Sequence, residues 1–397
     1  MAAGKARFYL EQSVPEFREW ERKKIFSKDE LASIAKKRSD FEHLLNSRGE
    51  STPPDYSRYA AYEMNLNALR RKRENRLGVK ATSYTGQRRV FFILDRGTRK
   101  FPGDLRLWTQ YIEFAKKEHA HKRLEKILTK VLRLHPTKPE LWIWAAKYML
   151  EDQADMFAAR VYMQRGLRFC ENDAALWLEY ARLEMIYVAK VAARQRILGL
   201  DENTTKQEET EMEEGMTADT IVLPEVTAED INPGLRDDKG YNAASQNLAS
   251  MPALSGTIPI AIFDSAMKHF KNDETLAEQF FDLIAEFDQA PCSRKILQHI
   301  LDSLIHSRPR STFAGICRFK LQLFGVLPTS PDFPRALRCS LQAIRGSMEE
   351  FPEAKKQLAR RTVSFLTQLA QNADLDPDVQ TALTASIRQF SKISEAG

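Results

Sequence analysis

The stretch LRLWTQYIEF at residues 105–114 decides the fold class of this sequence, because similar stretches recur along the chain. They are ELWIWAAKYM at 140–149 and ALWLEYARLE at 175–184, so that Trp108, Trp142 and Trp177 lie 34 and 35 residues apart. In two of the three, a tyrosine follows three residues after the tryptophan, namely Tyr111 and Tyr180. Positions i, i+3 and i+6 or i+7 share one face of an α-helix, so each stretch predicts an amphipathic helix.

A second helix is predicted just before each of these stretches, in the ranges 90–102, 124–136 and 159–171. Glycine inside a helix costs about 1 kcal/mol relative to alanine, so Gly97 and Gly166 are predicted to receive large side chains of a neighbouring helix. A single helical pair cannot bury its apolar face, whereas stacked pairs can. The tryptophans, tyrosines and glycines named above are therefore predicted to be scaffold residues of an all-α repeat array.

The sequence predicts four segments: an N-terminal helical segment over 1–55, clear repeats over 56–200, an acidic disordered insert or loop over 201–255, and degenerate repeats with closing helices over 256–397. In the first segment, Ser27 and Glu30 form an S-x-x-E capping box that predicts a helix from about Lys28. The start of the third segment, residues 201–219, contains no aromatic residue, so it buries too little surface to offset the entropy of ordering.

Composition and charge narrow the functional class. Hydrophobic residues make up 43% of the 397 positions, as in a folded protein, and no apolar run has the roughly 18 residues of a membrane span. We expect a reducing compartment, because the N-terminus has no apolar signal core and the four cysteines show no CxxC pairing. Residues 1–100 carry 23 Lys and Arg against 13 Asp and Glu, a net +10, which favours contact with a polyanion. Residues 201–239 carry 3 against 13, a net −10, which favours a basic partner.

A basic cluster ends the predicted helix over 57–78, and it is the candidate RNA contact of the chain: Arg70, Arg71, Lys72, Arg73 and Arg76. Arg70 and Arg73 share a helical face that Arg76 extends, and such a stripe suits phosphate groups. A solvated helix end remains the alternative, since basic residues are favoured there by the helix dipole.

Motifs of catalysis are missing from the sequence. It contains neither a G-x-G-x-x-G nor a G-x-x-x-x-G-K-[ST] phosphate loop, and no G-x-S-x-G elbow. The seven histidines, His269 among them, are interpreted as surface residues, because none of the spacings favours a metal site. The sequence therefore predicts no enzymatic activity, no cofactor and no metal.

The 34–35-residue period with W-x-x-Y aromatics resembles the half-a-tetratricopeptide (HAT) repeat. The N-terminal stretch LEQSVPEFREWERKKIFSKDELASIAKKRSDFEHLL, followed by YAAYEMNLNALRRKR, is similar to the family of U3 small nucleolar RNA-associated protein 6, the HAT-repeat subunit of the UTP-B module. The resemblance covers residues 6–190 and weakens beyond 255. It implies a right-handed superhelical solenoid of HAT (half-a-TPR) helical hairpins.

The same resemblance implies a nucleolar scaffold protein without catalytic activity. It would act in the small-subunit processome, the U3 snoRNP assembly on pre-ribosomal RNA that serves 18S rRNA maturation and 40S ribosome biogenesis. Its implied partners are WD40-propeller subunits of the same module and their peptide extensions, with no membrane and no small-molecule substrate. The alternative is a HAT-repeat RNA-binding protein of a splicing or mRNA 3′-end processing complex, in which the basic helix end would be the functional site.

Overall fold

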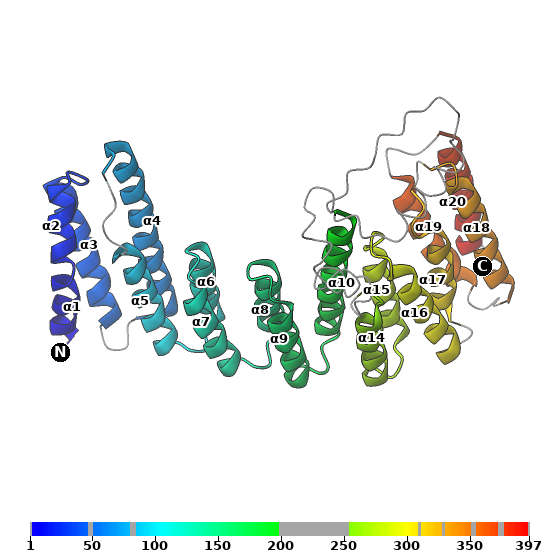
Figure 1. Cartoon of the computed structure of the whole chain (residues 1–397), viewed down its shortest axis with the longest axis horizontal. Helices are drawn as coiled ribbons and strands as arrows, with labels where there is room; N and C mark the ends of the chain where they lie inside the picture. Colours follow the sequence, from blue (N-terminus) through cyan, green and yellow to red (C-terminus); the bar gives the residue numbers. More distant parts are fainter. Residues whose placement is uncertain are drawn as a thin grey trace, which may run out of the picture. The chain divides into compact units, whose positions relative to one another are not determined.

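The computed structural model describes residues 2–46, 51–79, 85–197, 254–308, 311–327, 330–350, 355–371 and 377–395. All regular elements in these ranges are α-helices (Figure 1), so the predicted all-α class is confirmed. The right-handed HAT solenoid and the division into four segments stay predictions. The predicted insert over 201–255 lies outside the described residues except at its last two positions. None of the helices in the described ranges is both long and apolar enough to cross a lipid bilayer.

The chain divides into two compact units, Met1–Leu141 and Trp142–Gly397, and the division falls within α8. The first unit contains these helices: α1 (Ala2–Glu11), α2 (Val14–Arg22), α3 (Lys28–Asn46), α4 (Pro53–Leu77), α5 (Thr85–Lys100), α6 (Leu105–Lys117) and α7 (His121–Leu134). In this unit α3 packs on α1, α2 and α4, and α6 packs on α4, α5 and α7. The predicted capping box is confirmed at the start of α3, where Ser27 N donates to Glu30 Oε2 at 2.9 Å and Glu30 N donates to Ser27 Oγ at 3.2 Å.

The second unit takes most of α8 and all later helices: α8 (Pro139–Glu151), α9 (Met156–Phe169), α10 (Ala174–Ile197), α14 (Thr257–His269), α15 (Glu274–Ala285), α16 (Ser293–Ser307), α17 (Thr312–Leu323), α18 (Phe333–Glu350), α19 (Lys355–Ala370) and α20 (Pro377–Glu395). Helices adjacent in this order pair as hairpins, among them α15 with α16, α17 with α18 and α19 with α20. The closing helices predicted for the end of the chain correspond to α19 and α20.

The first helix of several hairpins begins in the same way. The carboxylates of Asp104, Asp173 and Asp273 cap α6, α10 and α15 by accepting hydrogen bonds from backbone N–H groups of the first turn. A buried leucine follows three residues after each aspartate: Leu107, Leu176 and Leu276. The next position holds Trp108, Trp177 or, in α15, Ala277. Because these helices begin in the same way, residues at the same distance from the helix start can be compared between hairpins that differ in sequence.

The second helix of each hairpin ends in a matching way. In α5, α7, α9 and α14, the backbone N–H just after the helix donates to the carbonyl four residues earlier, which belongs in turn to Gly97, Val131, Gly166 and Ala266. By this register α14 is the partner helix of α10, and the two helices pack against each other although residues 198–256 separate them in sequence. The acidic segment is therefore inserted within one hairpin, between its first and second helices.

Candidate interaction site

In two of the hairpins, the tryptophan near the start of the first helix is buried. Trp108 is 3% exposed, and its Nε1 donates to the carbonyl oxygen of Pro102 at 2.9 Å. Trp142 is 5% exposed, and its ring stacks on that of Phe169, the last residue of α9, with 5.9 Å between centroids and 13° between planes. These two side chains fasten the first helix of a hairpin to the end of its neighbour and leave no surface for a ligand.

Both predicted glycines lie where a side chain would collide with its neighbours. A Cβ at Gly97 would be 2.8 Å from Leu107 Cδ2 and 3.0 Å from Tyr56 Cδ1. A Cβ at Gly166 would be 2.9 Å from Trp142 Cβ and 3.4 Å from Leu176 Cδ2. Each glycine thus lies against an aromatic residue from the first helix of its own hairpin. It also lies against the leucine near the start of the next hairpin's first helix. At Gly97 that aromatic residue is Tyr56 of α4.

The two tyrosines of the stripe are also core residues. Tyr111 lies between Trp108 and Phe91, with ring centroids 6.4 and 6.1 Å away, and burial raises its pKa to about 12. Burial likewise raises the pKa of Tyr180, whose hydroxyl accepts a hydrogen bond from Gln164 Nε2 at 3.4 Å. Neither phenol is available to act as an acid or base near neutral pH.

Trp177 departs from the pattern of Trp108 and Trp142, because part of its surface stays exposed. Its ring stacks on the imidazole of His269 with 6.4 Å between centroids, and its Nε1 donates to the carbonyl oxygen of Glu171 at 3.2 Å. The side chain borders a cavity of about 510 Å³, which is lined by Leu167, Arg168, Glu171, Trp177, Ser265, Lys268 and His269. Trp177 is therefore less buried than the other two tryptophans of the repeated pattern, and its assignment as a scaffold residue stays a prediction.

The predicted basic stripe at the end of α4 does not lie on one surface. Arg70 is 4% exposed, with its Nε 3.6 Å from Glu74 Oε1, and it lies on the face of α4 that packs against the fold. Arg73 forms a two-fold ion pair with Glu30 at 2.8 Å, and its guanidinium covers the Phe26 ring. This pair holds the pKa of Glu30 at about 2, chiefly through the hydrogen bond from Arg73.

The other three basic residues of the cluster remain exposed. Arg71 reaches Glu118 of α6 at 2.9 Å, and Lys72 and Arg76 project from the helix end. The candidate RNA contact therefore shrinks to Arg71, Lys72 and Arg76. Spacing alone identified residues that share a helical face, but packing decides which face is buried.

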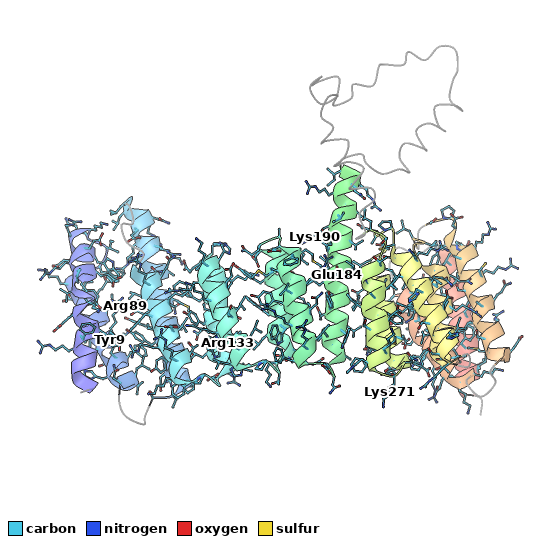
Figure 2. All side chains as sticks on the ribbon, turned by 60° about the horizontal axis from the view of Figure 1, so that its bottom comes forward. Tyr9, Arg89, Arg133, Glu184, Lys190 and Lys271 are labelled. Atoms are coloured by element: carbon cyan, nitrogen blue, oxygen red, sulfur yellow. The ribbon has the colours of Figure 1, made fainter. Side chains whose placement is uncertain are left out.

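A buried ionic network in the first unit was missed by the sequence analysis. Arg38 donates to both carboxylate oxygens of Glu63 at 2.7 and 2.9 Å and to Glu16 at 3.1 Å, and all three side chains are almost fully buried. Arg89, labelled in Figure 2, donates to Ser13 Oγ at 2.8 Å and lies 3.4 Å from Glu16. The network joins α2, α3, α4 and α5. Its partners are 22 to 76 residues apart, so no short motif announces it.

A second ion pair, between a partly exposed arginine and a buried glutamate, extends this contact. Arg96 of α5 reaches Glu42 of α3 at 2.9 Å, and its guanidinium lies over the rings of Tyr9 and Phe92. Removing one member of such a pair leaves an uncompensated charge in the interior, which is strongly destabilising. The N-terminal helices are thereby tied to the first hairpin by charge and by apolar contact together.

Chemically reactive groups are not brought together within the described ranges. They contain no group of three His, Cys, Asp or Glu side chains placed to hold a metal ion. Cys292 and Cys317 are buried free thiols whose pKa values are raised by burial, while Cys339 is an exposed free thiol.

Comparison with known proteins gives a consistent result. Residues 10–91 match the family model described as U3 small nucleolar RNA-associated protein 6. The protein of that name from Schizosaccharomyces pombe is 38% identical over 256 residues, which cover 62% of this chain and 52% of the relative. The homologue from Homo sapiens is 34% identical over 186 residues, which cover 46% of this chain and 31% of the relative. A homologue from Dictyostelium discoideum is 24% identical over 296 residues, covering 72% of this chain and 47% of the relative.

The matched region can be located on the structure. This chain spans about half the length of the fission yeast relative and less of the human one. The family-model match runs from the end of α1 into α5 and so contains Glu16, Arg38, Glu42, Glu63 and Arg89 of the buried ionic contacts. By these matches the chain is similar to the family of U3 small nucleolar RNA-associated protein 6, and the match to the family model lies in its N-terminal helices.

Proposed function

We propose that this chain is a non-catalytic scaffold subunit of the small-subunit processome, the U3-containing assembly that processes pre-ribosomal RNA in the nucleolus. The observation that carries the proposal is the family match over residues 10–91, which coincides with the helices that the ionic network fastens together. In this role the protein supports 18S rRNA maturation and 40S biogenesis by holding other subunits in place.

The partners in this proposal are WD40-propeller subunits of the UTP-B module and their peptide extensions. Paired helices present side chains from many hairpins at once, which suits extended segments of partner proteins better than small molecules. Pull-down of the tagged chain from nuclear extract tests the proposal, with nuclease treatment and a high-salt wash. Retention of propeller proteins supports it. Loss of all protein partners together with the RNA would refute it.

Direct RNA binding is the second candidate, and the exposed residues Arg71, Lys72 and Arg76 favour it. Phosphate contacts by three cations would make RNA affinity fall steeply with salt. The triple change of these residues to glutamine should then weaken binding of single-stranded RNA to the purified chain. Lys190→Gln is the matched control, because Lys190 is an exposed lysine of the other unit. Equal RNA affinity of both variants and the unchanged chain would remove this candidate.

A further inference from the structure

The cavity beside Trp177 lies at a defined place in the hairpin register. Trp177 is the fourth residue of α10, as Trp142 is of α8, and His269 is the last residue of α14, as Phe169 is of α9. The Trp177–His269 stack therefore occupies the place of the Trp142–Phe169 stack. In the same register Ala266, which is fully buried, stands where α9 has Gly166.

The equivalent place in the next hairpin is closed. There a cavity of only about 10 Å³ is bordered by Ala277 of α15 and by the ends of α14 and α16. The ion pair between Arg308 and Glu274, at 2.6 Å, spans its edge. The cavity at Trp177, of about 510 Å³, is thus far larger than the one at the equivalent position of the next hairpin.

The lining of the open cavity combines cations with apolar surface. Arg168 is the second-last residue of α9 and Lys268 the second-last residue of α14, and both side chains are exposed. Neither forms an ion pair with another described residue. Between them lie Leu167 and the partly exposed ring of Trp177. His269 is held in place because its Nε2 lies 3.1 Å from Asn172 Oδ1.

We propose that this cavity docks an acidic segment of a partner protein that carries one bulky apolar side chain beside its carboxylates. The apolar side chain would enter against Leu167 and Trp177, and the carboxylates would meet Arg168 and Lys268 on the two sides. A single hydrophobic anchor flanked by charge pairs is a common way to fix a short peptide segment.

The lining favours a peptide over a nucleic acid. Single-stranded RNA needs a track of positive charge that follows several phosphates and free aromatic faces for the bases. Here Glu171 adds a negative charge to the border, and one face of Trp177 is covered by His269. This inference rests on the proposed scaffold role in one respect: the bound partner is a protein. It adds the chemical class of the segment that binds.

Fluorescence anisotropy on the full chain tests the inference directly. The probe is a short fluorescein-labelled peptide with one leucine among glutamates, and its matched controls replace the glutamates by glutamine or the leucine by glycine. The double variant Arg168→Glu/Lys268→Glu reverses both cations at exposed positions and should leave folding unchanged. Lys190→Glu is its control, because Lys190 lies on α10 about 20 Å along the helix from Trp177. In Figure 2, Lys190 is labelled on the upper half of α10, whereas Lys271, which follows α14, is labelled at the lower edge of the structure.

We expect the unchanged chain and Lys190→Glu to bind the acidic probe, and the double variant to bind it about tenfold more weakly or not at all. Both control peptides should bind more weakly than the probe. Absence of probe binding, or equal binding by the double variant, would overturn the inference. Displacement of the probe by oligouridine at equal concentration would overturn it in favour of a nucleic-acid site.

The same variants separate this inference from the proposed function. If the unchanged chain retains propeller proteins in the nuclear pull-down but does not bind the acidic probe, the scaffold role stands and the pocket proposal fails. If the probe binds as expected but no propeller protein is retained by the unchanged chain, the pocket stands and the proposed assembly is wrong.

Discussion

The hairpin of α8 and α9 and the hairpin of α10 and α14 share one residue register and differ in how they close. In the first, Phe169 covers Trp142, and Gly166 lets the tryptophan approach the helix backbone. In the second, His269 takes the place of the phenylalanine and Ala266 that of the glycine, and Trp177 stays partly exposed. A tryptophan at the same position of the helix is therefore a core residue in the first hairpin, whereas it lines a cavity in the second.

The connections of the two hairpins differ even more than their contacts. Four residues, 152–155, join α8 to α9, whereas residues 198–256 lie between α10 and α14. Both pairs of helices still pack together. The entropy of closing a loop grows only with the logarithm of its length, so a long insertion costs a hairpin little once its helices have apolar faces to bury. How far the tryptophan side chain is buried does not follow from the length of the connection. It depends on the residue that stacks on the ring.

The largest difference is expected from truncating the two tryptophans. Trp142→Ala should lower the free energy of unfolding of its unit by about 3–5 kcal/mol, because it leaves a buried cavity. Trp177→Ala should cost less than half as much, because part of that side chain is already in contact with water. Thermal unfolding followed by circular dichroism measures both. Equal losses would show that the two hairpins close in the same way.

Ion pairs of the two second helices provide the next test. Arg160 of α9 holds the buried carboxylate of Glu184, labelled on α10 in Figure 2, at 2.7 and 2.8 Å. Asp264 of α14 meets His299 at 2.8 Å, with both side chains exposed. Arg160→Ala leaves the Glu184 charge buried and should cost about 3 kcal/mol. Asp264→Asn should change stability by less than about 0.5 kcal/mol.

Chemical denaturation of both variants measures this difference. Arg160→Lys serves as the control that keeps the positive charge but loses the two-pronged hydrogen bond, and it should fall between the unchanged chain and Arg160→Ala. A loss at Asp264→Asn as large as that at Arg160→Ala would contradict the assignment of buried and exposed pairs.

Exchanging the small residues should produce a smaller effect. Gly166→Ala gains about 1 kcal/mol of helix propensity, but its methyl group would press on Trp142, at a cost of about 1–3 kcal/mol. We therefore expect a net loss of melting temperature. Gly346→Ala in α18 is the control, because an added Cβ there has no neighbour within 4 Å, and it should raise the melting temperature. A stabilised Gly166→Ala would disprove the close approach of Trp142.

The smallest expected effect comes from restoring the aromatic stack. His269→Phe copies the partner of Trp142 and should stabilise the second unit by about 0.5–1 kcal/mol, because it adds an aromatic pair and apolar cover. The acidic probe should bind this variant more weakly, since the larger ring fills part of the cavity. Melting temperature and anisotropy are the two measurements. A variant with unchanged probe affinity would show that the cavity does not depend on the histidine.

Much of the helical architecture is predictable from the sequence. The aromatic period located α6, α8 and α10, the segments between them located α5, α7 and α9, and Ser27 with Glu30 marked the start of α3. These signals are local: residues within one turn or one repeat share a face or cap an end, so their spacing is visible in the chain. The N-terminal stretch also carried the family resemblance that the match over residues 10–91 bears out.

The candidate site was less predictable for a physical reason. Arg70 and Arg73 share a helical face, but Arg70 is buried beside Glu74, and Arg73 is engaged by Glu30 at a partly exposed position. Burial depends on which helix packs on which face, and spacing within one helix does not contain that information. The partners of Arg38 and Arg89 are likewise distant in the chain, so their charges looked like those of a solvated surface.

The sequence by itself determined that this protein is helical, where its repeated tryptophans fall, and which family its N-terminal part resembles. Only the tertiary structure decided that α14 completes the hairpin begun by α10, that His269 rather than a phenylalanine meets Trp177, and that Arg168 and Lys268 face one cavity. Helix formation follows from interactions over a few residues. A binding surface is assembled from helix ends that packing brings together across long stretches of chain, and it is the apolar burial of the helices that selects which ends meet.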